Sequence, residues 1–420
     1  MPYTHSKDPQ LTQTGRLQVD ALAFSSAVPA EGAVVRVMPH GKKYEVIEEM
    51  ITDSSGQTPV LSLPAPPIEY SMEPSEKIPY SEYDVSITAE GYEPVVVEGV
   101  QILPETTSYQ DVNLHTILDY DNQNTIVIED HVLLGTHPPK IPEEDVKPLP
   151  PSMGLVVLPE PVVPEFVIVH MGRPQNTSAK RHWIPFKDYI KNVASSEIYA
   201  NWPAQTIKAN VLAIISFTLN RVFTEWYRGK GHDFTITSST AFDQAFNYGR
   251  NIFDEISVIV DEIFTTFITK PNIRQPLLTQ YCDGRKVSCP NWMTQWGAKS
   301  LGDQGYAAID ILKHFYGNEI YLMQAPKVEG VPASYPGTPL QMGSAGENVR
   351  IIQEQINAIS NNFPAIKKVR VDGIFGDQTR ESIETFQRVF KLAPDGIVGF
   401  STWYKLSDIY VAVTRMAELR

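Results

Sequence analysis

The pattern of hydrophobic and polar residues divides the chain into three parts. Residues 15–115 contain short alternating runs, such as GAVVRVM and YDVSITA, which are separated by turn signals and show no helical period. This pattern predicts an all-β sandwich. From residue 165 to about 325 helical and strand patterns are mixed, which predicts an α+β domain, and after about residue 335 a regular helical period predicts a small all-α bundle.

The first helix expected in the central part, over residues 186–199, carries an acid on its apolar face. The apolar positions recur with a 3.6-residue period at Phe186, Tyr189, Ile190, Val193 and Ala194. The next position on this face is Glu197, so its carboxyl group is expected to point toward the interior. Burial raises a carboxyl pKa, which would let Glu197 keep a proton near neutral pH. The period alone leaves open a partly exposed helix end or an internal ion pair with a Lys or Arg.

A second helix of the central part is expected over residues 203–227. The C-terminal part contains a short motif that occurs twice. The segments VDGIFGDQT (371–379) and PDGIVGFSTW (394–403) share the spacing D-G-I-x-G-x-x-T. Their glycines permit tight turns, and Thr379 and Thr402 are expected to cap the helices that follow. Together with a helix expected within GSAGENVRIIQEQIN, these segments predict three helices.

Nine prolines between residues 138 and 164 separate the first part from the second. Proline at this density keeps the backbone extended and removes N–H donors, so we expect a semi-rigid linker that a protease can reach. The charge also changes here, because residues 1–150 hold 24 acidic and 8 basic residues, whereas residues 151–420 hold 25 and 27. Neither part has a basic stripe, which argues against nucleic acid as a partner.

Few features of the sequence bear on compartment or cofactors. The N-terminus lacks a cationic segment followed by an apolar stretch, and the apolar run at residues 211–217 is too short to span a bilayer. We therefore expect a soluble protein with no visible signal peptide and no membrane partner. Cys282 and Cys289 could form a disulfide, bind a metal or remain free thiols. The histidines share no metal-ligand spacing and no nucleotide fingerprint is present, so no cofactor is expected.

Two of the three parts resemble known binding or scaffolding modules. The segments GAVVRV, TDSSGQT, LPAPP and YDVSITAEGYEPV are similar, in this order, to the transthyretin-like or carboxypeptidase-regulatory-like β-sandwich, which implies a scaffolding or covering role. The C-terminal motifs DGIFG-x-x-T, F-Q and DGIVG-x-x-T-W, preceded by G-x-x-V-x-x-I-Q, resemble the three-helix peptidoglycan-binding module. That resemblance implies peptidoglycan as a partner.

The central part resembles the lytic transglycosylase branch of the SpoIID/LytB family of bacterial sporulation proteins. The resemblance is carried by IPFKDYIKNVASSEIYANWP (184–203), QTIKANVLAIISFTLNR, TSSTAFDQAF and TQWGAKSLGDQGYAAIDILKHFYG. The family's catalytic glutamate occupies the S-E position, which implies that Glu197 is the catalytic acid. The candidates for substrate binding are Asp243, Gln244, Tyr248, Tyr281, Gln295 and Trp296.

The residues themselves leave alternatives for several of these candidates. An Asp that follows a turn is often a helix cap, which applies to Asp243, and Trp296 could equally belong to the core. The H-G-x-G element that many family members carry before S-Q-W-G-A is replaced here by CPNWMTQWGA. No histidine lies beside Cys282 and Cys289, so these residues fall short of a four-ligand zinc site.

Taken together, the chain resembles clostridial spore cortex-lytic enzymes of the SleC type. This implies a zymogen, located in the cortex or coat region of a bacterial spore, from which a subtilisin-like germination protease removes an N-terminal segment. The cut is expected near Gln123 or near Val156. The segments are an N-terminal sandwich (1–118), a linker with the cleavage region (119–164), a SpoIID-like catalytic domain (165–328) and a peptidoglycan-binding domain (335–410).

The implied reaction is cleavage of the MurNAc–GlcNAc bond of cortex peptidoglycan during germination, which gives 1,6-anhydro-muramyl ends. Two groups of alternatives remain. The first is another enzyme on the same polymer, either a muramidase that uses water or an N-acetylmuramoyl-L-alanine amidase, which normally needs zinc. The second is a non-catalytic, wall-binding structural protein of the spore.

Overall fold

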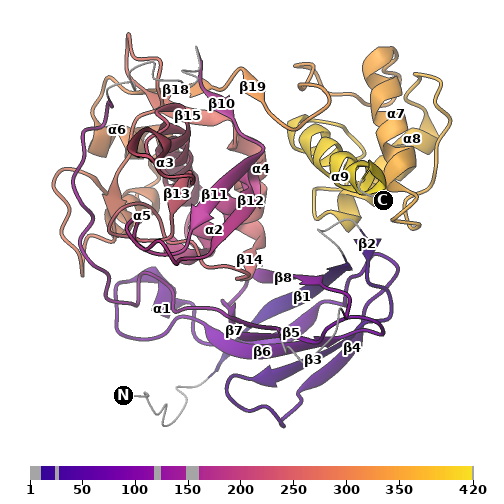
Figure 1. Ribbon diagram of the computed structural model, residues 1–420, viewed down its shortest axis with the longest axis horizontal. Helices are drawn as coiled ribbons and strands as arrows, with labels where there is room; N and C mark the ends of the chain where they lie inside the picture. The colour runs from indigo at the N-terminus through magenta and orange to yellow at the C-terminus, as the bar shows by residue number, and fades with distance from the viewer. Residues whose placement is uncertain (1–10, 24–27, 118–123, 148–159, 419–420) are drawn as a thin grey trace.

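The computed structural model of the protein describes residues 11–23, 28–117, 124–147 and 160–418. These residues form a strand-rich N-terminal region, a central region of helices and short strands, and a helical C-terminal region (Figure 1). In this view the C-terminal helices lie beside the central region, and the strand-rich region lies below both. Both positions predicted for cleavage, Gln123 and Val156, lie outside the described residues.

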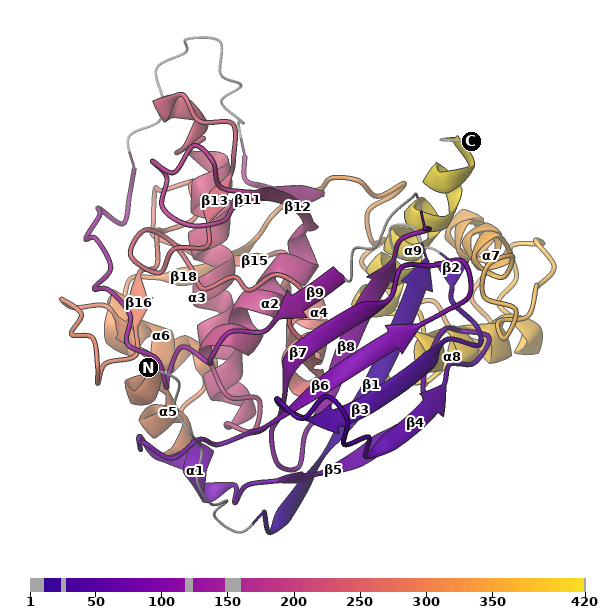
Figure 2. The ribbon, with the colours of Figure 1, turned by 60° about the horizontal axis from the view of Figure 1, so that its bottom comes forward.

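Two sheets build the N-terminal region (Figure 2). One sheet has the strand order β4-β3-β6-β7-β9, and the other has the order β14-β8-β1-β2, with β5 also paired to β1. The edge strand β14 (Ile252–Phe253) comes from the central region and pairs antiparallel with β8. The other elements are β1 (Gln13–Ala23), β2 (Val28–Pro29), β3 (Val34–Pro39), β4 (Glu48–Ile51), β5 (Leu61–Ala65), α1 (Glu69–Met72), β6 (Ser81–Thr88), β7 (Val95–Ile102), β8 (Thr107–Leu114) and β9 (Asn124–Val127).

The alternating pattern explains how these strands form a core. On β1, Leu17, Val19 and Ala21 are fully buried and alternate with residues that reach solvent. Successive side chains of a strand point to opposite faces, so this alternation gives the sheet one apolar face. That face shares a single hydrophobic core with Val35 and Val85 of the other sheet. The N-terminal region is therefore strand-rich, and its relation to one particular sandwich family stays a prediction.

Helix α3 (Ala204–Phe223) lies at the centre of the central region (Figure 1). Its residues 211–215 are all buried, so this part of the helix is enclosed on every side. It ends at Phe223, earlier than the expected end at Tyr227. Its neighbours are α2 (Phe186–Glu197), α4 (Asp254–Ile263), α5 (Gln295–Asp303), α6 (Ala308–Tyr316) and β15 (Thr266–Thr269).

Short strands complete the central region. β11 (Phe166–His170) pairs with β12 (Arg181–Pro185) and β13 (Ile236–Thr237), and β15 pairs with β18 (Tyr321–Gln324). The remaining elements are β10 (Val162–Val163), β16 (Tyr281–Cys282), β17 (Met293–Thr294), β19 (Lys327–Val328) and the 3₁₀ helix η1 (Arg228–Lys230).

The C-terminal region contains α7 (Glu347–Ile359), α8 (Asp377–Val389) and α9 (Phe400–Glu418). Gln353 of α7 ties the following loop to its own helix, because its side-chain amide donates to the Asp372 carboxylate, the Ile374 carbonyl and the Thr379 hydroxyl at 3.2, 3.0 and 3.2 Å. Its carbonyl oxygen accepts from the backbone N–H groups of residues 372 and 373. We call this group of contacts the Gln353 cage.

The second copy of the motif repeats these contacts around Gln387 of α8. The Gln387 amide donates to the Asp395 carboxylate, the Ile397 carbonyl and the Thr402 hydroxyl at 2.7, 3.0 and 3.2 Å, and its carbonyl accepts from Gly396. We call this group the Gln387 cage. The repeated sequence therefore encodes a repeated polar contact between a helix and the loop after it.

The prediction that Thr379 caps the helix after it is wrong. Helix α8 begins after Gly376, and no side chain caps its first turn. Thr379 lies within the helix, and Thr402 likewise lies within α9. Both hydroxyls accept hydrogen bonds from the cage glutamines, which explains the threonine without a capping role.

Polar contacts join the C-terminal helices to the other two regions. The Ser401 hydroxyl of α9 donates to the Asp261 carbonyl of α4 at 3.1 Å, and Lys187 of α2 pairs with Asp408 of α9 at 2.5 Å. Lys391, after α8, pairs with Asp20 of β1 at 2.5 Å. Across the described ranges, no helix combines the length and the apolar character needed to cross a bilayer.

Candidate active site

Glu197 is the last residue of α2, and its side chain points into the protein. The chain leaves the helix at Ile198, whose backbone is extended. Only 2% of Glu197 is exposed, and the apolar positions of α2 are buried with it. The predicted helix is confirmed over Phe186–Glu197 and ends two residues earlier than expected, and the predicted inward direction of Glu197 is confirmed as well.

Two hydrogen bonds hold the Glu197 carboxyl group. The backbone N–H of Ala245 donates to Oε1 at 2.7 Å, and the Gln295 side-chain amide donates to Oε2 at 3.5 Å. Ala245 follows the TSSTAFDQ segment and Gln295 begins α5, so two separate stretches of the resemblance meet at this carboxyl group. The acid is thus positioned by contacts from outside its own helix.

Burial raises the pKa of Glu197, and the positive charge of Lys140 and the Ala245 N–H group oppose that rise in part. Burial likewise lowers the pKa of Lys140, while the negative charge of Glu197 raises it. A carboxyl group with a raised pKa keeps its proton closer to neutral pH, as a general acid must.

The Glu197 carboxyl group borders a small cavity of about 40 Å³. Tyr281, Asp283 and Gln295 line it from the central region, and Lys140 lines it from the segment that follows the N-terminal sheets. The space suffices for a few water molecules and is too small for a sugar ring.

A disulfide closes the loop on one side of this cavity. Cys282 and Cys289 are bonded to each other, so of the three states left open by the sequence the structure has the disulfide. The carboxylate of Asp283 accepts hydrogen bonds from the backbone N–H groups of residues 285–287. Within the described ranges, no group of three or more His, Cys, Asp or Glu residues could hold a metal ion.

Residues 128–147, which we call the strap, cover this site. The side-chain amide of Gln280 accepts from the Glu143 N–H and donates to the Ile141 carbonyl, both at 2.8 Å. Gln275 makes the same pair of contacts with the backbone N–H and carbonyl of Lys147, both at 2.9 Å. Two glutamines of the central region thus bind the strap backbone as they would bind a peptide.

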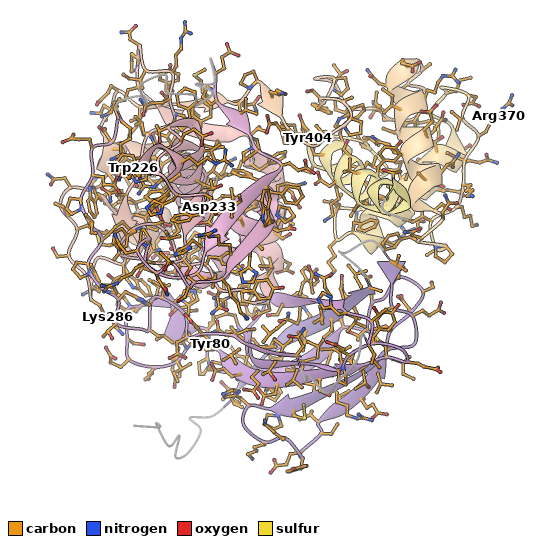
Figure 3. The ribbon with its side chains drawn as sticks, viewed as in Figure 1. Tyr80, Trp226, Asp233, Lys286, Arg370 and Tyr404 are labelled. Carbon is orange, nitrogen blue, oxygen red and sulfur yellow. A yellow bond between two sulfur atoms is a disulfide. The ribbon has the colours of Figure 1, made fainter. Side chains whose placement is uncertain are left out.

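The N-terminal end of the strap is held as well. The backbone N–H of His131 donates to the Tyr80 hydroxyl at 3.2 Å, and the Val132 N–H donates to the Ser196 carbonyl at 3.1 Å. The Lys286 ammonium donates to the Leu134 carbonyl. Tyr80 and Lys286 are labelled in Figure 3, where Tyr80 lies between the strand-rich and central regions.

These contacts correct the expectation of an open linker for residues 138–147. The prolines keep this stretch free of helix or strand, as expected, but its remaining N–H and carbonyl groups are bound by the central region. Lys147, at the end of the described stretch, is only 5% exposed. The linker is therefore docked up to Lys147.

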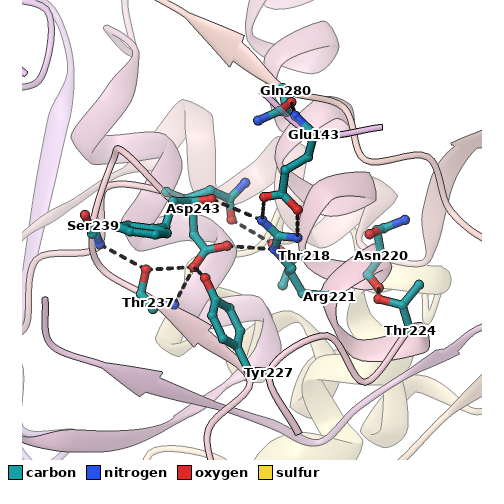
Figure 4. A network of polar contacts seen from close by, with 12 residues as sticks. Glu143, Thr218, Asn220, Arg221, Thr224, Tyr227, Thr237, Ser239, Asp243 and Gln280 are labelled. Atoms are coloured by element: carbon teal, nitrogen blue, oxygen red, sulfur yellow. Dashed lines mark hydrogen bonds and ion pairs between the residues drawn. The ribbon is translucent and has the colours of Figure 1, made fainter. Parts of the chain in front are cut away.

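A buried charge network lies beside the strap (Figure 4). Arg221 of α3 donates from Nε to Asp243 Oδ1 at 2.7 Å, and its two terminal nitrogens donate to the Glu143 carboxylate at 3.1 and 2.6 Å. Asp243 Oδ2 accepts from the Tyr227 hydroxyl at 2.6 Å and from the N–H and hydroxyl of Thr237 at 2.9 and 2.7 Å. Asp243 is fully buried, so the structure places it beneath the site and not on a sugar-facing surface.

The other predicted binding residues divide into two groups. Tyr281 and Gln295 border the cavity of Glu197. Gln244 is fully buried and accepts hydrogen bonds from the Tyr189 and Thr218 hydroxyls at 3.1 and 2.9 Å, which supports the site from below.

Tyr248 and Trp296 lie outside the cavity lining. Tyr248 is 43% exposed and stacks on His182 with the ring centroids 4.1 Å apart. Trp296 packs against Trp202, with the ring centroids 5.0 Å apart, and contributes to the hydrophobic core. Trp296 is half-buried, so it packs against the core, as the sequence left open, and keeps part of its side chain exposed.

Sequence reasoning missed Lys140, Glu143 and Arg221. Each carried a signal, since Lys140 and Glu143 interrupt a proline-rich stretch and Arg221 ends a long apolar helix pattern. A buried charge needs a partner, so an Arg within an apolar helix pattern indicates an acid elsewhere in the chain.

A family model described as "Putative peptidoglycan binding domain" matches residues 345–406, so the chain carries a peptidoglycan-binding domain in its C-terminal region. No curated protein matches the chain. Among solved structures, the SleB N-terminal domain is 27% identical over 18% of this chain and 99% of its own, with a TM-score of 0.16. A peptidoglycan-binding protein from Clostridioides difficile, in complex with glutamine hydroxamate, is 27% identical over 17% of this chain and 42% of its own, with a TM-score of 0.15.

The Bacillus anthracis TIE protein is 17% identical over 25% of this chain and 17% of its own, with a TM-score of 0.18. At TM-scores this low, the three solved structures carry no argument about the central region. The comparisons thus establish the binding domain, and the chemistry of the central region has to be argued from its own residues.

Proposed function

We propose that this chain is the zymogen of a spore cortex-lytic enzyme that cleaves the MurNAc–GlcNAc bond of peptidoglycan as a lytic transglycosylase. The observation that carries the proposal is a buried, hydrogen-bonded Glu197 with a raised pKa, in a chain that also holds a peptidoglycan-binding domain. The spore and germination setting rests on the resemblance to SleC-type enzymes and is part of the same proposal.

Glu197 supplies the proton in the first step. Its carboxyl group protonates the glycosidic oxygen, the bond from that oxygen to the muramyl anomeric carbon breaks, and an oxocarbenium-like centre forms. The muramyl 6-hydroxyl then attacks the anomeric carbon and gives its proton to the Glu197 carboxylate. The acid is regenerated, no water is consumed, and a 1,6-anhydro ring is the product.

A single available carboxyl group fits this reaction better than hydrolysis. Hydrolases of this kind use a second carboxylate as base or nucleophile. The other carboxylate that borders the cavity, Asp283, accepts three backbone hydrogen bonds within the disulfide loop, which gives it a structural role.

The strap supports the zymogen part of the proposal. With residues 128–147 docked, the space next to Glu197 admits water and no glycan, and Lys140 places a positive charge beside the acid. A cut near Gln123 alone would leave these residues attached to the central region. A cut near Val156, on the C-terminal side of Lys147, breaks the covalent link between the strap and the central region and so allows the strap to dissociate, and we therefore expect activation to require the second position.

The test digests purified cortex peptidoglycan with the full chain before and after treatment with a subtilisin-like protease, and identifies the fragments by mass spectrometry. We expect anhydro-muramyl ends only after treatment, and none from Glu197→Gln. Glu255→Gln is the matched control, because burial also raises the pKa of Glu255, to about 8, while Glu255 lies outside the cavity lining. Reducing muramyl ends would identify a muramidase, released stem peptides an amidase, and binding without fragments a wall-binding protein.

A further inference from the structure

Arg221 is bound by two sets of acceptors, one in the central region and one in the strap. Its Nε atom donates to Asp243 and one terminal nitrogen donates to the Phe242 carbonyl at 3.1 Å, both within the central region. The two terminal nitrogens also grip the Glu143 carboxylate in a two-pronged contact. Glu143 belongs to the strap, which the proposed function removes. Activation would therefore remove the Glu143 carboxylate from Arg221 and leave the Asp243 carboxylate in place.

The Arg221 guanidinium would keep its orientation after the strap has left. Asp243, which holds Nε, is itself fixed by Tyr227 and Thr237 and is fully buried. The guanidinium is thus locked on one edge, while the edge that faced Glu143 carries free N–H donors. Buried donors without acceptors are costly, and a fixed guanidinium edge suits a planar carboxylate in two-pronged geometry.

Arg221 also borders a cavity of the central region. The cavity measures about 320 Å³ and is lined by Arg221 together with Phe166, Trp183, Trp226 and Tyr227. Trp183 is 67% exposed, and aromatic faces of this kind suit the apolar faces of sugar rings. The central region therefore offers aromatic surface beside a buried cation.

The strap also covers part of this aromatic surface. The Lys147 ammonium lies 4.3 Å from the ring centroid of Trp226 and 2.8 Å from the Glu143 carboxylate. Lys147 and Glu143 both belong to the strap, so both would leave on activation. Their departure would uncover a face of the Trp226 ring and would remove Lys147, which pairs with Glu143 alongside Arg221. Lys230, 3.4 Å from the same ring centroid, belongs to the central region and remains. Trp226 is labelled in Figure 3.

The strap contacts both the Glu197 site and Arg221, in a fixed order along its sequence. Lys140 faces Glu197, and Glu143, three residues further on, occupies Arg221. Three residues of extended chain span about 10 Å. One strand of the polymer lying along the path of the strap would therefore meet the acid and, a short distance away, the Arg221 guanidinium.

We infer that the strap is a substrate mimic, and that Arg221 of the activated enzyme binds a carboxylate carried by the muramyl units of the glycan, in the place that Glu143 occupies before activation. The inference rests on the proposed function, since it takes the ligand to be peptidoglycan. The carboxylate has two sources, the lactyl group of muramic acid and the free carboxyl end of its peptide stem. Arg221 is then a specificity residue that selects muramyl units over plain N-acetylglucosamine.

The first experiment measures affinity for soluble ligands. The full chain carrying Glu197→Gln is cut by a subtilisin-like protease, and dissociation constants are measured for N,N′-diacetylchitobiose, GlcNAc-MurNAc and GlcNAc-MurNAc-L-alanine. Chitobiose lacks the carboxylate, and we expect it to bind at least tenfold more weakly than the better muramyl ligand. A preference for GlcNAc-MurNAc identifies the lactyl carboxylate, and a preference for the L-alanine form identifies the stem. Equal affinity for all three ligands, or no binding, overturns the inference.

Arg221→Lys in the same protein keeps the charge and loses the two-pronged edge, and we expect it to reduce the preference for the muramyl ligand by most of the tenfold. Because Arg221 is buried and this variant could fail to fold, a second measurement uses the full, uncut chain with Glu143→Ala. Acetate should raise its melting temperature, whereas acetamide, which has the same shape without the charge, should not. Equal effects of the two compounds, or no effect of either, overturn the inference.

The two proposals can fail separately. Cortex cleavage by the activated wild-type chain together with equal affinities for the three ligands would remove only the carboxylate site. No cleavage together with a retained muramyl preference would remove the enzyme and leave a muramyl-recognition site at Arg221.

Discussion

The C-terminal helices and the central site satisfy their buried polar groups in opposite ways. In the Gln353 cage every partner lies within 26 residues of the glutamine, and the Gln387 cage is tighter still, with its most distant partner 15 residues away. In the central site, Glu143 and Arg221 are 78 residues apart, and Glu197 and Gln295 are 98 apart. A polar cluster built from nearby residues belongs to one folding unit, whereas a cluster built across the chain can be taken apart by one cut.

This contrast suggests why the two regions differ in function. Each cage holds a loop onto its own helix, so the polar groups of both cages are satisfied within the C-terminal region itself. The strap joins the central region through side chains and backbone groups that peptide-like ligands also use. A partner bound in this manner can be exchanged for another ligand, as the proposed zymogen activation requires.

The largest expected effect is that of Asp243→Asn. Asp243 neutralises the fully buried Arg221 from within the central region, and removing one partner of a buried ion pair typically costs about 3–5 kcal/mol. Hydrogen exchange measured by mass spectrometry should show faster exchange in α3, with the C-terminal helices unchanged. Asp233→Asn is the matched control, because Asp233 is exposed and pairs with Arg181 on the surface. Equal exchange in both variants would contradict the view that Asp243 supports the site.

The second-largest expected effect is the loss of unfolding free energy when the central glutamine of either cage is replaced. Gln353→Ala leaves the loop N–H groups and the Thr379 hydroxyl without their partner, and we expect the C-terminal helices to lose about 2–3 kcal/mol of unfolding free energy. Gln387→Ala should cost a similar amount, since it makes the corresponding contacts. The losses should add in the double variant, because the cages share no residue. Urea unfolding of the full chain, followed by exchange in α7 and α8, measures both; a large loss from only one variant would break the equivalence of the two repeats.

The acid itself should show a pH effect of known sign. The folded-state pKa of Glu197 is raised above its ordinary value of 4.5, so the carboxyl group favours the folded state below that pH and loses this contribution as pH rises through the folded pKa. The melting temperature of Glu197→Gln, compared with the wild type, should therefore rise progressively above about pH 4.5. Lys140 and the Ala245 N–H offset part of the burial, which limits the size of the effect.

Lys140→Met provides the companion measurement. It removes the positive charge that lowers the pKa of Glu197, so this pKa should rise further. Carbon NMR titration of the labelled Glu197 side chain measures the change. An unchanged pKa would mean that the strap does not act on the acid electrostatically.

The sequence predicted those parts that depend on local periodicity. The helix over 186–199 appears as α2, and the same period that defined it placed Glu197 inward. The contacts of the strap could not be predicted in this way. Lys140 and Glu143 lie in a stretch without any period, and their partners are set by how distant segments pack. Proline density correctly indicated an irregular backbone there, but it says nothing about whether a neighbouring surface binds that backbone.

The smallest expected effect comes from the threonine for which the sequence predicted the wrong role. Thr379→Val removes a hydroxyl that accepts one hydrogen bond from Gln353, and the loss should be about 1 kcal/mol, with Thr379→Ser close to wild type. A capping threonine would show similar values, so the single variants do not separate the two roles. The double variant with Gln353→Ala does separate them. If Thr379 acts only as the acceptor of Gln353, its replacement should cost almost nothing once Gln353 is absent, whereas a cap would cost the same in both backgrounds. Additive losses in the double variant would mean that Thr379 stabilises the first turn of α8 independently of Gln353. Thr379 would then not count among the partners of the Gln353 cage.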